Sequence, residues 1–307
     1  MRVFLTGASG HIGSAVVPEL LDAGHEVVGL ARSEDSASAL EATGAEVRRG
    51  DLDDVEGLRD AAANADGVIH LAFKHEAMQS GDFAGAVASD LRAIEAIGSG
   101  LEGSGKPFVS TSGTLMLAFG GIAGRAGTEE DAIEGGPRVD AENRVVAMAE
   151  RGVRSSVVRL PPLVHSTLDH HGFGPTLIGI AREKGASGYV GDGANRWPAV
   201  HTLDAARAYR LALESAQPGT RLHAVGDNGV AFREIAETIG AKLGVPAVSV
   251  AAEQAGEHFS FLGPFVAMDN LTSSDLTRQW LGWEPAGPGL IEDLAEGHYF
   301  EQDEDAR

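Results

Sequence analysis

The sequence contains no cysteine among its 307 residues. This absence excludes disulfides, thiolate nucleophiles, iron–sulfur clusters and zinc sites built only from cysteine. Lysine is scarce as well, and occurs only at positions 74, 106, 184 and 242. Basic residues number 24 against 45 acidic ones, which gives a net charge of −21. Because a protein this acidic repels phosphate backbones and anionic lipids, we expect neither nucleic acid nor a membrane as a partner.

Long hydrophobic runs are also missing. No stretch approaches the roughly 20 apolar residues that cross a bilayer, and the N-terminus does not have the pattern of a secretory signal peptide. We therefore expect a soluble, cytoplasmic protein. Hydrophobic residues make up 43% of the chain and charged residues 22%, which is typical of a globular protein with a sizeable core.

The first half of the chain alternates short β-rich runs with helical patterns, which predicts a parallel, doubly wound sheet. Strands are expected at residues 3–6, 26–30, 45–48, 67–71, 107–110 and 155–160. Helices are expected at 12–21, 36–42, 55–63, 83–98, 139–151, 203–215 and 232–243, and a loop at 280–288 before a last helix at 289–297. The predicted fold class is α/β, with a Rossmann-type domain at 1–165 and a smaller C-terminal substrate lobe at 166–307 packed on it.

A glycine-rich loop, Thr6 to Gly13, joins the first expected strand to the first helix. Gly7 permits a tight turn, Gly10 lets backbone amides approach a pyrophosphate, and Gly13 lets helix and strand pack closely. The start of the helix offers free N–H groups and partial positive charge to the same anion. We expect a dinucleotide to be bound here by Gly7, Ser9, Gly10, His11, Ile12 and Gly13.

The end of the second expected strand bears on the choice between NAD and NADP. A carboxylate there would bind the ribose 2′-hydroxyl and repel a 2′-phosphate, but the chain has Arg32 and Ser33. Both can bind a phosphate, so NADP(H) is preferred and NAD(H) remains possible; alternatively, Arg32 is a solvated surface residue. After the third strand, Asp51 and Leu52 are expected near the adenine, unless Asp51 caps the next helix.

These features resemble the short-chain dehydrogenase/reductase superfamily, and the Thr-Gly-x-x-Gly-x-x-Gly loop resembles that of its extended, epimerase-like branch. Residues 66–72 (Asp-Gly-Val-Ile-His-Leu-Ala), 108–113 (Phe-Val-Ser-Thr-Ser-Gly) and 157–165 (Val-Val-Arg-Leu-Pro-Pro-Leu-Val-His) are similar to further motifs of the family. The resemblance implies that the cofactor also contacts Leu71, Ala72, Phe73, Thr111, Pro161 and Val164. It implies in addition that the fifth strand carries the family's catalytic serine, here Ser112.

The catalytic Tyr-x-x-x-Lys pair of the family is absent. The matching helix reads Arg138-Val139-Asp140-Ala141-Glu142-Asn143 and contains neither tyrosine nor lysine. This departure resembles the atypical short-chain dehydrogenases, which keep the glycine loop but lack the standard active-site residues. Arg138 and Glu142 are four residues apart, so they can form a structural ion pair on the helix. Alternatively, Arg138 holds a substrate carboxylate or enolate and Glu142 orients it.

Two residues are candidates for the remaining chemistry. The Ser112 hydroxyl can orient a substrate carbonyl or hydroxyl, with Thr111 or Thr114 as substitutes; a serine bonded to nearby backbone is the structural alternative. His75 follows the fourth strand, at the edge where doubly wound sheets bind ligands, and can donate a proton near neutral pH. Its alternative is an ordinary surface loop.

The C-terminal half adds a possible substrate pocket. His165, Asp169, His170 and His171 follow the sixth strand; we expect a pocket loop there rather than a metal site, because His170 and His171 are adjacent and no cysteine helps. Residues 188–201 are similar to a segment of extended-branch enzymes. The expected pocket residues are His165, Asn195, Arg196, Trp197 and His201, although Trp197 is equally typical of a core aromatic residue.

Three functions fit the sequence. The first is an NADPH-dependent oxidoreductase that reduces a small carbonyl compound, as a monomer or homodimer. The second is an NAD-dependent sugar-nucleotide epimerase or dehydratase, which Arg32 and the shortage of a basic diphosphate site count against. The third is a non-catalytic NADP(H)-binding regulator, in which the missing pair reflects lost chemistry.

Overall fold

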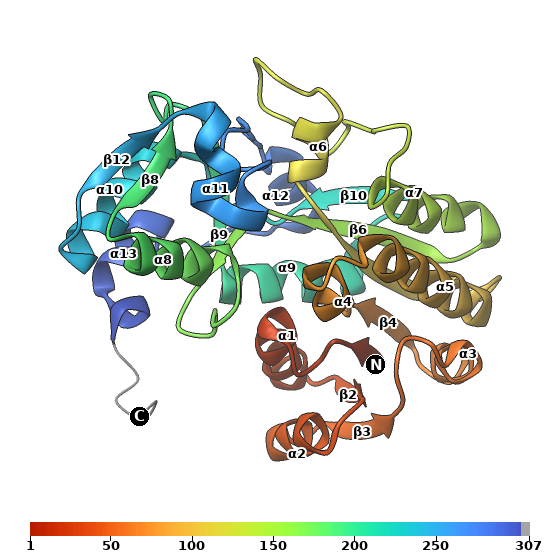
Figure 1. Ribbon diagram of the computed structural model, residues 1–307. Coiled ribbons are helices and arrows are strands. Elements are labelled where there is room, and N and C mark those ends of the chain that lie inside the picture. Colours follow the sequence, from red (N-terminus) through yellow and green to blue (C-terminus); the bar gives the residue numbers. More distant parts are fainter. Residues whose placement is uncertain (302–307) are drawn as a thin grey trace.

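The computed structural model describes residues 1–301, except for the side chains of residues 78 and 79. Within these residues the main sheet has seven parallel strands in the order β10-β6-β5-β4-β1-β2-β3 (Figure 1). They are β1 (Arg2–Thr6), β2 (Glu26–Ala31), β3 (Glu46–Arg49), β4 (Gly67–His70), β5 (Pro107–Gly113), β6 (Arg154–Leu160) and β10 (Thr220–His223). The strand order reverses at β1 and β4, and the carboxyl edge at this switch point is where such sheets bind ligands.

Helices cover both faces of the main sheet (Figure 1). Val3 and Leu5 of β1 pack into the core on one face, and Phe4 packs into the core on the other. The first face is covered by α1 (His11–Asp22), α2 (Glu34–Thr43) and α9 (Thr202–Ser215), the second by α3 (Val55–Ala63), α5 (Phe83–Leu101) and α7 (Val139–Ala147). The inner strands β1, β4 and β5 are buried on both faces, and they are mostly apolar until their carboxyl ends, where polar side chains begin.

Two shorter helices follow strands at this edge: α4 (His75–Gln79) comes after β4, and α6 (Leu115–Phe119) comes after β5. The C-terminal lobe contains a sheet of order β11-β9-β7 and a β12-β8 pair. Its strands are β7 (Leu163–His165), β8 (Ser187–Val190), β9 (Arg196–His201), β11 (Asp227–Ala231) and β12 (Ala247–Val250). The later helices are α8 (Phe173–Lys184), α10 (Phe232–Leu243), α11 (Ala255–Phe259), α12 (Asp275–Leu281) and α13 (Leu290–Glu296), with 3-10 turns η1 (Met148–Arg151), η2 (Ala252–Gln254), η3 (Ser260–Leu262) and η4 (His298–Phe300).

The expected α/β fold class is confirmed, and all six expected strands are present. The seventh strand, β10, was not predicted; it joins the main sheet beside β6, and α9 packs on the same sheet. The prediction that a loop begins at residue 280 is wrong, because α12 extends to Leu281. Among the described residues, no helix is both long and apolar enough to cross a membrane.

Candidate active site

The glycine-rich loop has the geometry of an anion-binding turn. Gly7 has a φ of +71°, and a Cβ there would lie 2.7 Å from the backbone nitrogen of Ala72. A Cβ on Gly13 would lie 2.1 Å from the Gly7 carbonyl oxygen. Gly10 precedes α1 and no side chain caps that end of the helix. The loop therefore leaves the first N–H groups of α1 available for a pyrophosphate, as a dinucleotide site requires.

Two guanidinium groups lie near the end of β2. Arg32 is largely exposed and forms an ion pair with Glu76 at 2.5 Å. Arg49 donates to the Ser33 carbonyl at 2.6 Å and pairs with Glu34 at 2.8 Å. Ser33 itself caps α2, because its hydroxyl accepts the N–H of Ser36 at 3.2 Å. Arg49 was not singled out in the sequence; the signal was its place at the end of β3, in register with Ala31.

The residues after β3 have local structural roles. Asp51 does not cap α3; its carboxylate accepts the backbone N–H groups of Asp53 and Asp54 at 2.7 and 3.2 Å, which closes a turn. The cap is Asp54, which accepts the N–H of Gly57. Leu52 is buried in the core beneath α3.

A chain of buried polar contacts crosses the carboxyl edge at the switch point. His70 bonds Thr6 through Nδ1 at 2.7 Å and Asp90 through Nε2 at 3.1 Å. A carboxylate only accepts hydrogen bonds, so the Nε2–H donates to Asp90, and in the neutral imidazole Nδ1 then accepts the Thr6 hydroxyl. The other Asp90 oxygen accepts from Arg138 Nη1 at 3.0 Å. These hydrogen bonds therefore hold Arg138, at the start of α7, against the end of β4.

Arg138 and His75 come together at Phe73. The Arg138 guanidinium carbon lies 4.2 Å from the centre of the Phe73 ring, a geometry in which the ring attracts the cation. The His75 ring meets Phe73 edge-on, with centroids 5.2 Å apart. His75 is exposed, but its neighbours remove part of its hydration, and this effect, followed by the charge of Arg138, lowers its pKa. This places a fixed positive charge and a titratable imidazole around one ring that follows β4.

Glu142 does not pair with Arg138, so the expected helical ion pair is wrong. Its buried carboxylate binds Arg159 at 2.5 Å and Arg221 at 2.7 Å. Burial raises the pKa of the Glu142 carboxyl, but the two guanidinium groups outweigh it and the pKa falls below its usual range. Arg159 also donates to His223 at 3.1 Å. Glu142 therefore fastens α7 to β6 and β10, and it does not orient Arg138.

Ser112 lies in the same layer as Glu142. It is 5% exposed and in register with Arg159 on the neighbouring strand, and its hydroxyl faces the Glu142 carboxylate, whose pKa it helps to lower. Thr111 and Thr114, the expected alternatives to Ser112, already form hydrogen bonds within the fold. Thr111 donates to the His70 carbonyl at 2.9 Å, and Thr114 is fully buried and donates to Asn270 at 2.8 Å. The predicted catalytic residues thus divide into two groups, His75 with Arg138 and Ser112 with Glu142.

The predicted pocket residues do not line one common pocket. Trp197 as a pocket residue is wrong, since it is 0% exposed and packs between Phe173 and Phe232 in the lobe core. Asn195 donates to the carbonyls of Val266 and Met268, and Arg196 pairs with Asp269 at 2.7 Å. These bonds fasten the 266–270 segment to β9. Asn195 and Arg196 therefore have structural roles in the fold of the lobe.

His165 and His201 remain neighbours, with ring centroids 5.7 Å apart. His165 is buried and its Nδ1 bonds Asp293 at 2.9 Å. Asp293, Glu296 and His298 each bring one potential ligand atom within 4.8 Å of the others, a grouping that was not predicted from the sequence.

Two of the expected cofactor residues follow β6. Pro161 is buried, and Val164 packs against the core that includes α1 and α9.

The loop after β7 reaches the start of α1. His11 bonds Thr202 through Nε2 at 2.8 Å, and its Nδ1 lies 3.5 Å from the Asp169 carboxylate. Burial raises the pKa of Asp169 from 3.8 to about 6, and burial lowers the pKa of His11 to about 4. A carboxylate that resists ionisation therefore lies beside the loop where a pyrophosphate would bind.

The Asp169→Asn variant is expected to have a different pH dependence of stability. Folding raises the pKa of Asp169 to about 6, so the folded state binds its proton more tightly than the unfolded state. The free energy of unfolding contributed by this group therefore falls as pH rises through about 6, by about 1 kcal/mol between pH 5 and pH 7.5. Urea unfolding of the variant should show that amount regained at pH 7.5. A difference from wild type that is constant with pH would contradict the assignment; Asp22→Asn, at the exposed end of α1, is the control.

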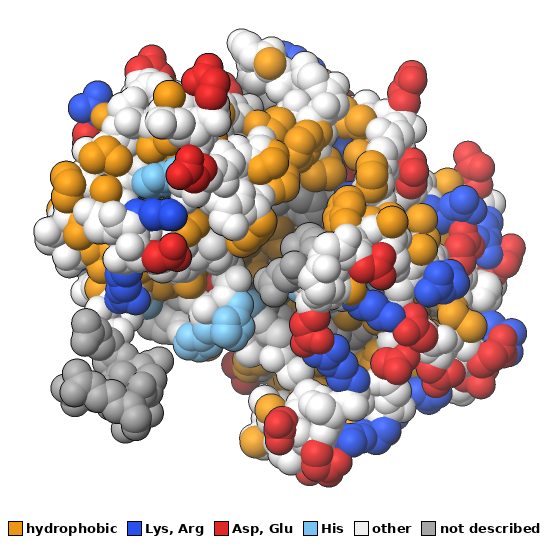
Figure 2. Space-filling view, in the orientation of Figure 1, with side chains coloured by type: hydrophobic (Ala, Val, Ile, Leu, Met, Phe, Trp, Pro, Cys, Tyr) orange, Lys and Arg blue, Asp and Glu red, His pale blue; other side chains and the backbone are white. Residues whose placement is uncertain are grey.

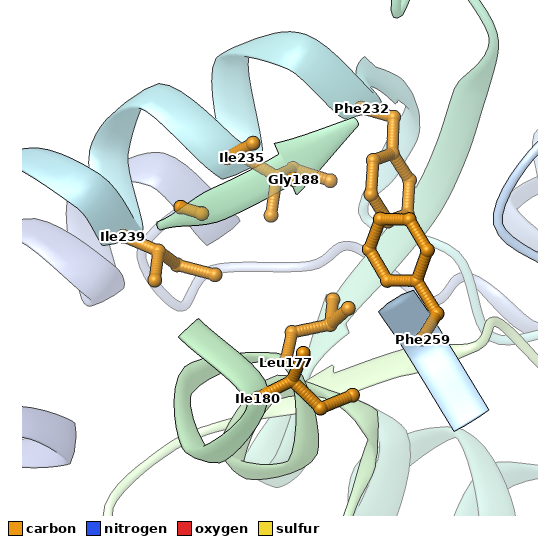
Figure 3. A pocket seen from close by; sticks show the side chains of 9 residues that line it. Leu177, Ile180, Gly188, Phe232, Ile235, Ile239 and Phe259 are labelled. Carbon is orange, nitrogen blue, oxygen red and sulfur yellow. The ribbon is translucent and has the colours of Figure 1, made fainter. Parts of the chain in front are cut away.

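A small cavity lies away from these groups, in the core of the lobe (Figure 3). It is lined by Leu177, Ile180, Ser187, Gly188, Phe232, Ile235, Ala236, Ile239 and Phe259. Its volume of 10 Å³ holds no more than about one water molecule. The cavity is therefore a packing defect of the lobe core and not a substrate site.

The parallel sheet, the glycine-rich loop and the start of α1 together define an NAD(P)-binding Rossmann protein. Comparisons with known proteins agree with this class. Residues 7–158 match a family model described as NAD(P)H-binding. The uncharacterized protein C2A9.02 of Schizosaccharomyces pombe is 46% identical, over 98% of this chain and 100% of its own. The 2-alkyl-3-oxoalkanoate reductase of Stenotrophomonas maltophilia is 28% identical, over 93% and 92%. The solved structure of DesIV, a dTDP-glucose 4,6-dehydratase from Streptomyces venezuelae, has a TM-score of 0.75 at 21% identity, covering 97% of this chain and 96% of that one.

The chain belongs to the same family as the Schizosaccharomyces pombe protein, and residues 7–158 form an NAD(P)H-binding domain. Its similarity to the Stenotrophomonas reductase and, at 27% identity over 97% of this chain, to the UDP-glucose 4-epimerase of Streptomyces lividans is consistent with the expected short-chain dehydrogenase/reductase superfamily. The absence of the Tyr-x-x-x-Lys pair is consistent with an atypical member. Arg138 and Glu142, on the helix expected to carry that pair, each bind partners from other elements.

Proposed function

We propose that this protein is an NADPH-dependent reductase of small carbonyl compounds. The observation that carries the proposal is the fixed guanidinium of Arg138, held by Asp90 and Phe73 beside the carboxyl end of β4. Bound NADPH supplies a hydride to the carbonyl carbon. Arg138 donates hydrogen bonds to the carbonyl oxygen and stabilises the negative charge that forms on it. His75, or water beside it, delivers the proton that completes the alcohol.

Arg138 suits a reductase as a hydrogen-bond donor, and it cannot itself act as the base that an epimerase or dehydratase requires. Those reactions begin with oxidation of a substrate hydroxyl, which requires a base to take the hydroxyl proton. A guanidinium stays charged and cannot accept a proton, whereas it serves well as a donor to a developing alkoxide. The Stenotrophomonas relative is a 2-alkyl-3-oxoalkanoate reductase, which supports the same direction.

The preference for NADPH rests on the charges around Ser33. Arg32 and Arg49 can both turn toward a 2′-phosphate, since their present partners, Glu76 and Glu34, are exposed carboxylates. Exposed ion pairs are worth about 0–1 kcal/mol and are readily exchanged for a phosphate. Asp90 and Glu142 act as positioning residues, because each holds α7 in place. Ser112 lies beside Glu142 and Arg159, where its hydroxyl can relay a proton through water.

The test is NADPH oxidation by the purified protein with a panel of aldehydes, ketones, quinones and enones, with NADH run alongside. We expect turnover that is faster with NADPH. The Arg32→Asp variant should raise the KM for NADPH about tenfold or more and leave NADH nearly unchanged, because it adds repulsion toward the 2′-phosphate only. Arg59→Asp, on the exposed face of α3, is the matched control.

Two other results of that experiment would redirect the proposal. Release of stoichiometric NAD on denaturation would favour the epimerase or dehydratase alternative. Saturable NADPH binding without turnover on any compound would favour a non-catalytic cofactor-binding regulator. Equal loss of NADPH and NADH in Arg32→Asp would contradict the preference for NADPH.

A further inference from the structure

Three segments of the chain contain no charged residue at all: 113–124, 172–181 and 259–268. They are far apart in the sequence, yet their aromatic side chains meet. Phe119 of α6 contacts Phe265 edge-on, with centroids 5.6 Å apart and planes at 90°. Phe173 of α8 lies 6.4 Å from Phe265 and 6.3 Å from Phe261. We refer to Phe119, Phe173, Phe261 and Phe265 as the aromatic wall.

The aromatic wall continues directly from the candidate active site. Its α6 begins two residues after the end of β5, and buried bonds between Thr114 and Asn270, at 2.8 and 3.0 Å, fasten α6 to the segment that carries Phe265. Figure 2 shows hydrophobic side chains around the upper rim of the hollow between the lobe and the main sheet, with charged side chains on the outer surfaces. The wall therefore lies over the carboxyl side of the sheet.

The outer members of the wall are unusually exposed for large apolar side chains. Phe119 is 51% exposed and Phe261 is 47% exposed. Exposed aromatic rings grouped beside a polar site are typical of a surface that an apolar ligand covers. A ring or hydrocarbon chain placed there would be removed from water together with the phenylalanines.

The charges nearby do not suit a nucleoside diphosphate. Such a ligand needs cationic side chains at its phosphates, but the three segments supply none. The arginines on neighbouring elements are held more firmly than Arg32: Asp269 accepts three hydrogen bonds from Arg196, one of them from its backbone N–H, and Arg182 donates to the carbonyls of Tyr299 and Phe300.

We infer that the substrate is an aromatic or similarly apolar carbonyl compound, whose carbonyl group meets Arg138 and whose apolar body lies on the aromatic wall. This inference rests on the proposed reductase function and specifies its substrate class. The chemistry of the wall excludes a polyhydroxylated or diphosphate-bearing substrate from the same position, because its polar groups would lose water without gaining partners.

The experiment compares two aldehydes, cinnamaldehyde and glyceraldehyde, in wild type and in Phe119→Ala, with Trp280→Ala as the control for loss of an exposed aromatic side chain elsewhere. We expect wild type to prefer cinnamaldehyde. Phe119→Ala should lower kcat/KM for cinnamaldehyde about tenfold, mainly through KM, and change glyceraldehyde little. A preference for glyceraldehyde, or equal losses in Phe119→Ala and Trp280→Ala, would overturn the inference and leave the reductase function standing.

A second measurement does not depend on turnover. Isothermal titration of cinnamyl alcohol into the protein with NADP⁺ should give binding that Phe119→Ala weakens about tenfold and Trp280→Ala does not. Such binding without turnover on any aldehyde would support the apolar site and overturn the reductase function. If the alcohol does not bind wild type, the substrate class is wrong.

Discussion

In the Arg138→Gln variant, kcat for carbonyl reduction is expected to fall about a hundredfold or more, because a preorganised donor to a developing oxyanion contributes about that much. Glutamine can still hydrogen-bond Asp90, which keeps the local geometry, but it carries no charge to place opposite the alkoxide. NADPH binding should change little, since the glycine loop and Arg32 lie on other elements. The measurement is steady-state kinetics with the best carbonyl substrate, together with the Kd for NADPH.

The controls for this variant come from the same helix. Arg144 of α7 is 57% exposed and pairs with Glu95 at 2.7 Å, so Arg144→Gln removes a guanidinium without touching the site. Removing the Arg138 charge leaves the buried Asp90 carboxylate without its cationic partner, which costs stability. The Asp90→Asn/Arg138→Gln double variant relieves that unpaired charge. Unchanged kcat in Arg138→Gln, or restored kcat in the double variant, would show that Arg138 acts only through folding.

Much of the fold follows from local sequence. Short apolar runs and the stop at Gly24 are enough to predict β1, α1 and β2, because a parallel strand that is buried on both faces is apolar along most of its length. The β10 strand is different. Its sequence, Thr-Arg-Leu-His, is apolar only at Leu222, and Arg221 and His223 are accommodated by Glu142 and Arg159. A strand whose polar side chains are paired by distant residues has no local signature.

The same reason limits prediction of the site. The glycine loop could be predicted because its requirements lie within eight residues of chain. The spacing of Arg138 and Glu142 allowed a helical pair, but Asp90 on α5 and Arg159 on β6 bind them instead. Which partner prevails depends on how β4, β5 and β6 are ordered, and spacing along one helix does not contain that information. Trp197 likewise becomes core because α8 and α10 close around it.

The Gly13→Ala variant is expected to lose cofactor binding altogether. The added Cβ would lie 2.1 Å from the Gly7 carbonyl oxygen and 2.6 Å from that of Ala8, and both are backbone atoms that cannot rotate away. Either α1 moves from the loop or the loop opens, and each change removes the N–H groups that face a pyrophosphate. The free energy of unfolding should fall by about 3 kcal/mol, in the range of overpacked cores.

Gly179→Ala separates this effect from the general effect of alanine in a helix. Gly179 lies within α8, is exposed, and has nothing within 4 Å of an added Cβ. Alanine there should raise the free energy of unfolding by about 0.5–1 kcal/mol, because it restricts the unfolded chain and suits a helix. Fluorescence titration with NADPH and urea unfolding measure both variants. If Gly13→Ala bound NADPH as wild type does, the close approach of α1 to the loop would not be what creates the anion site.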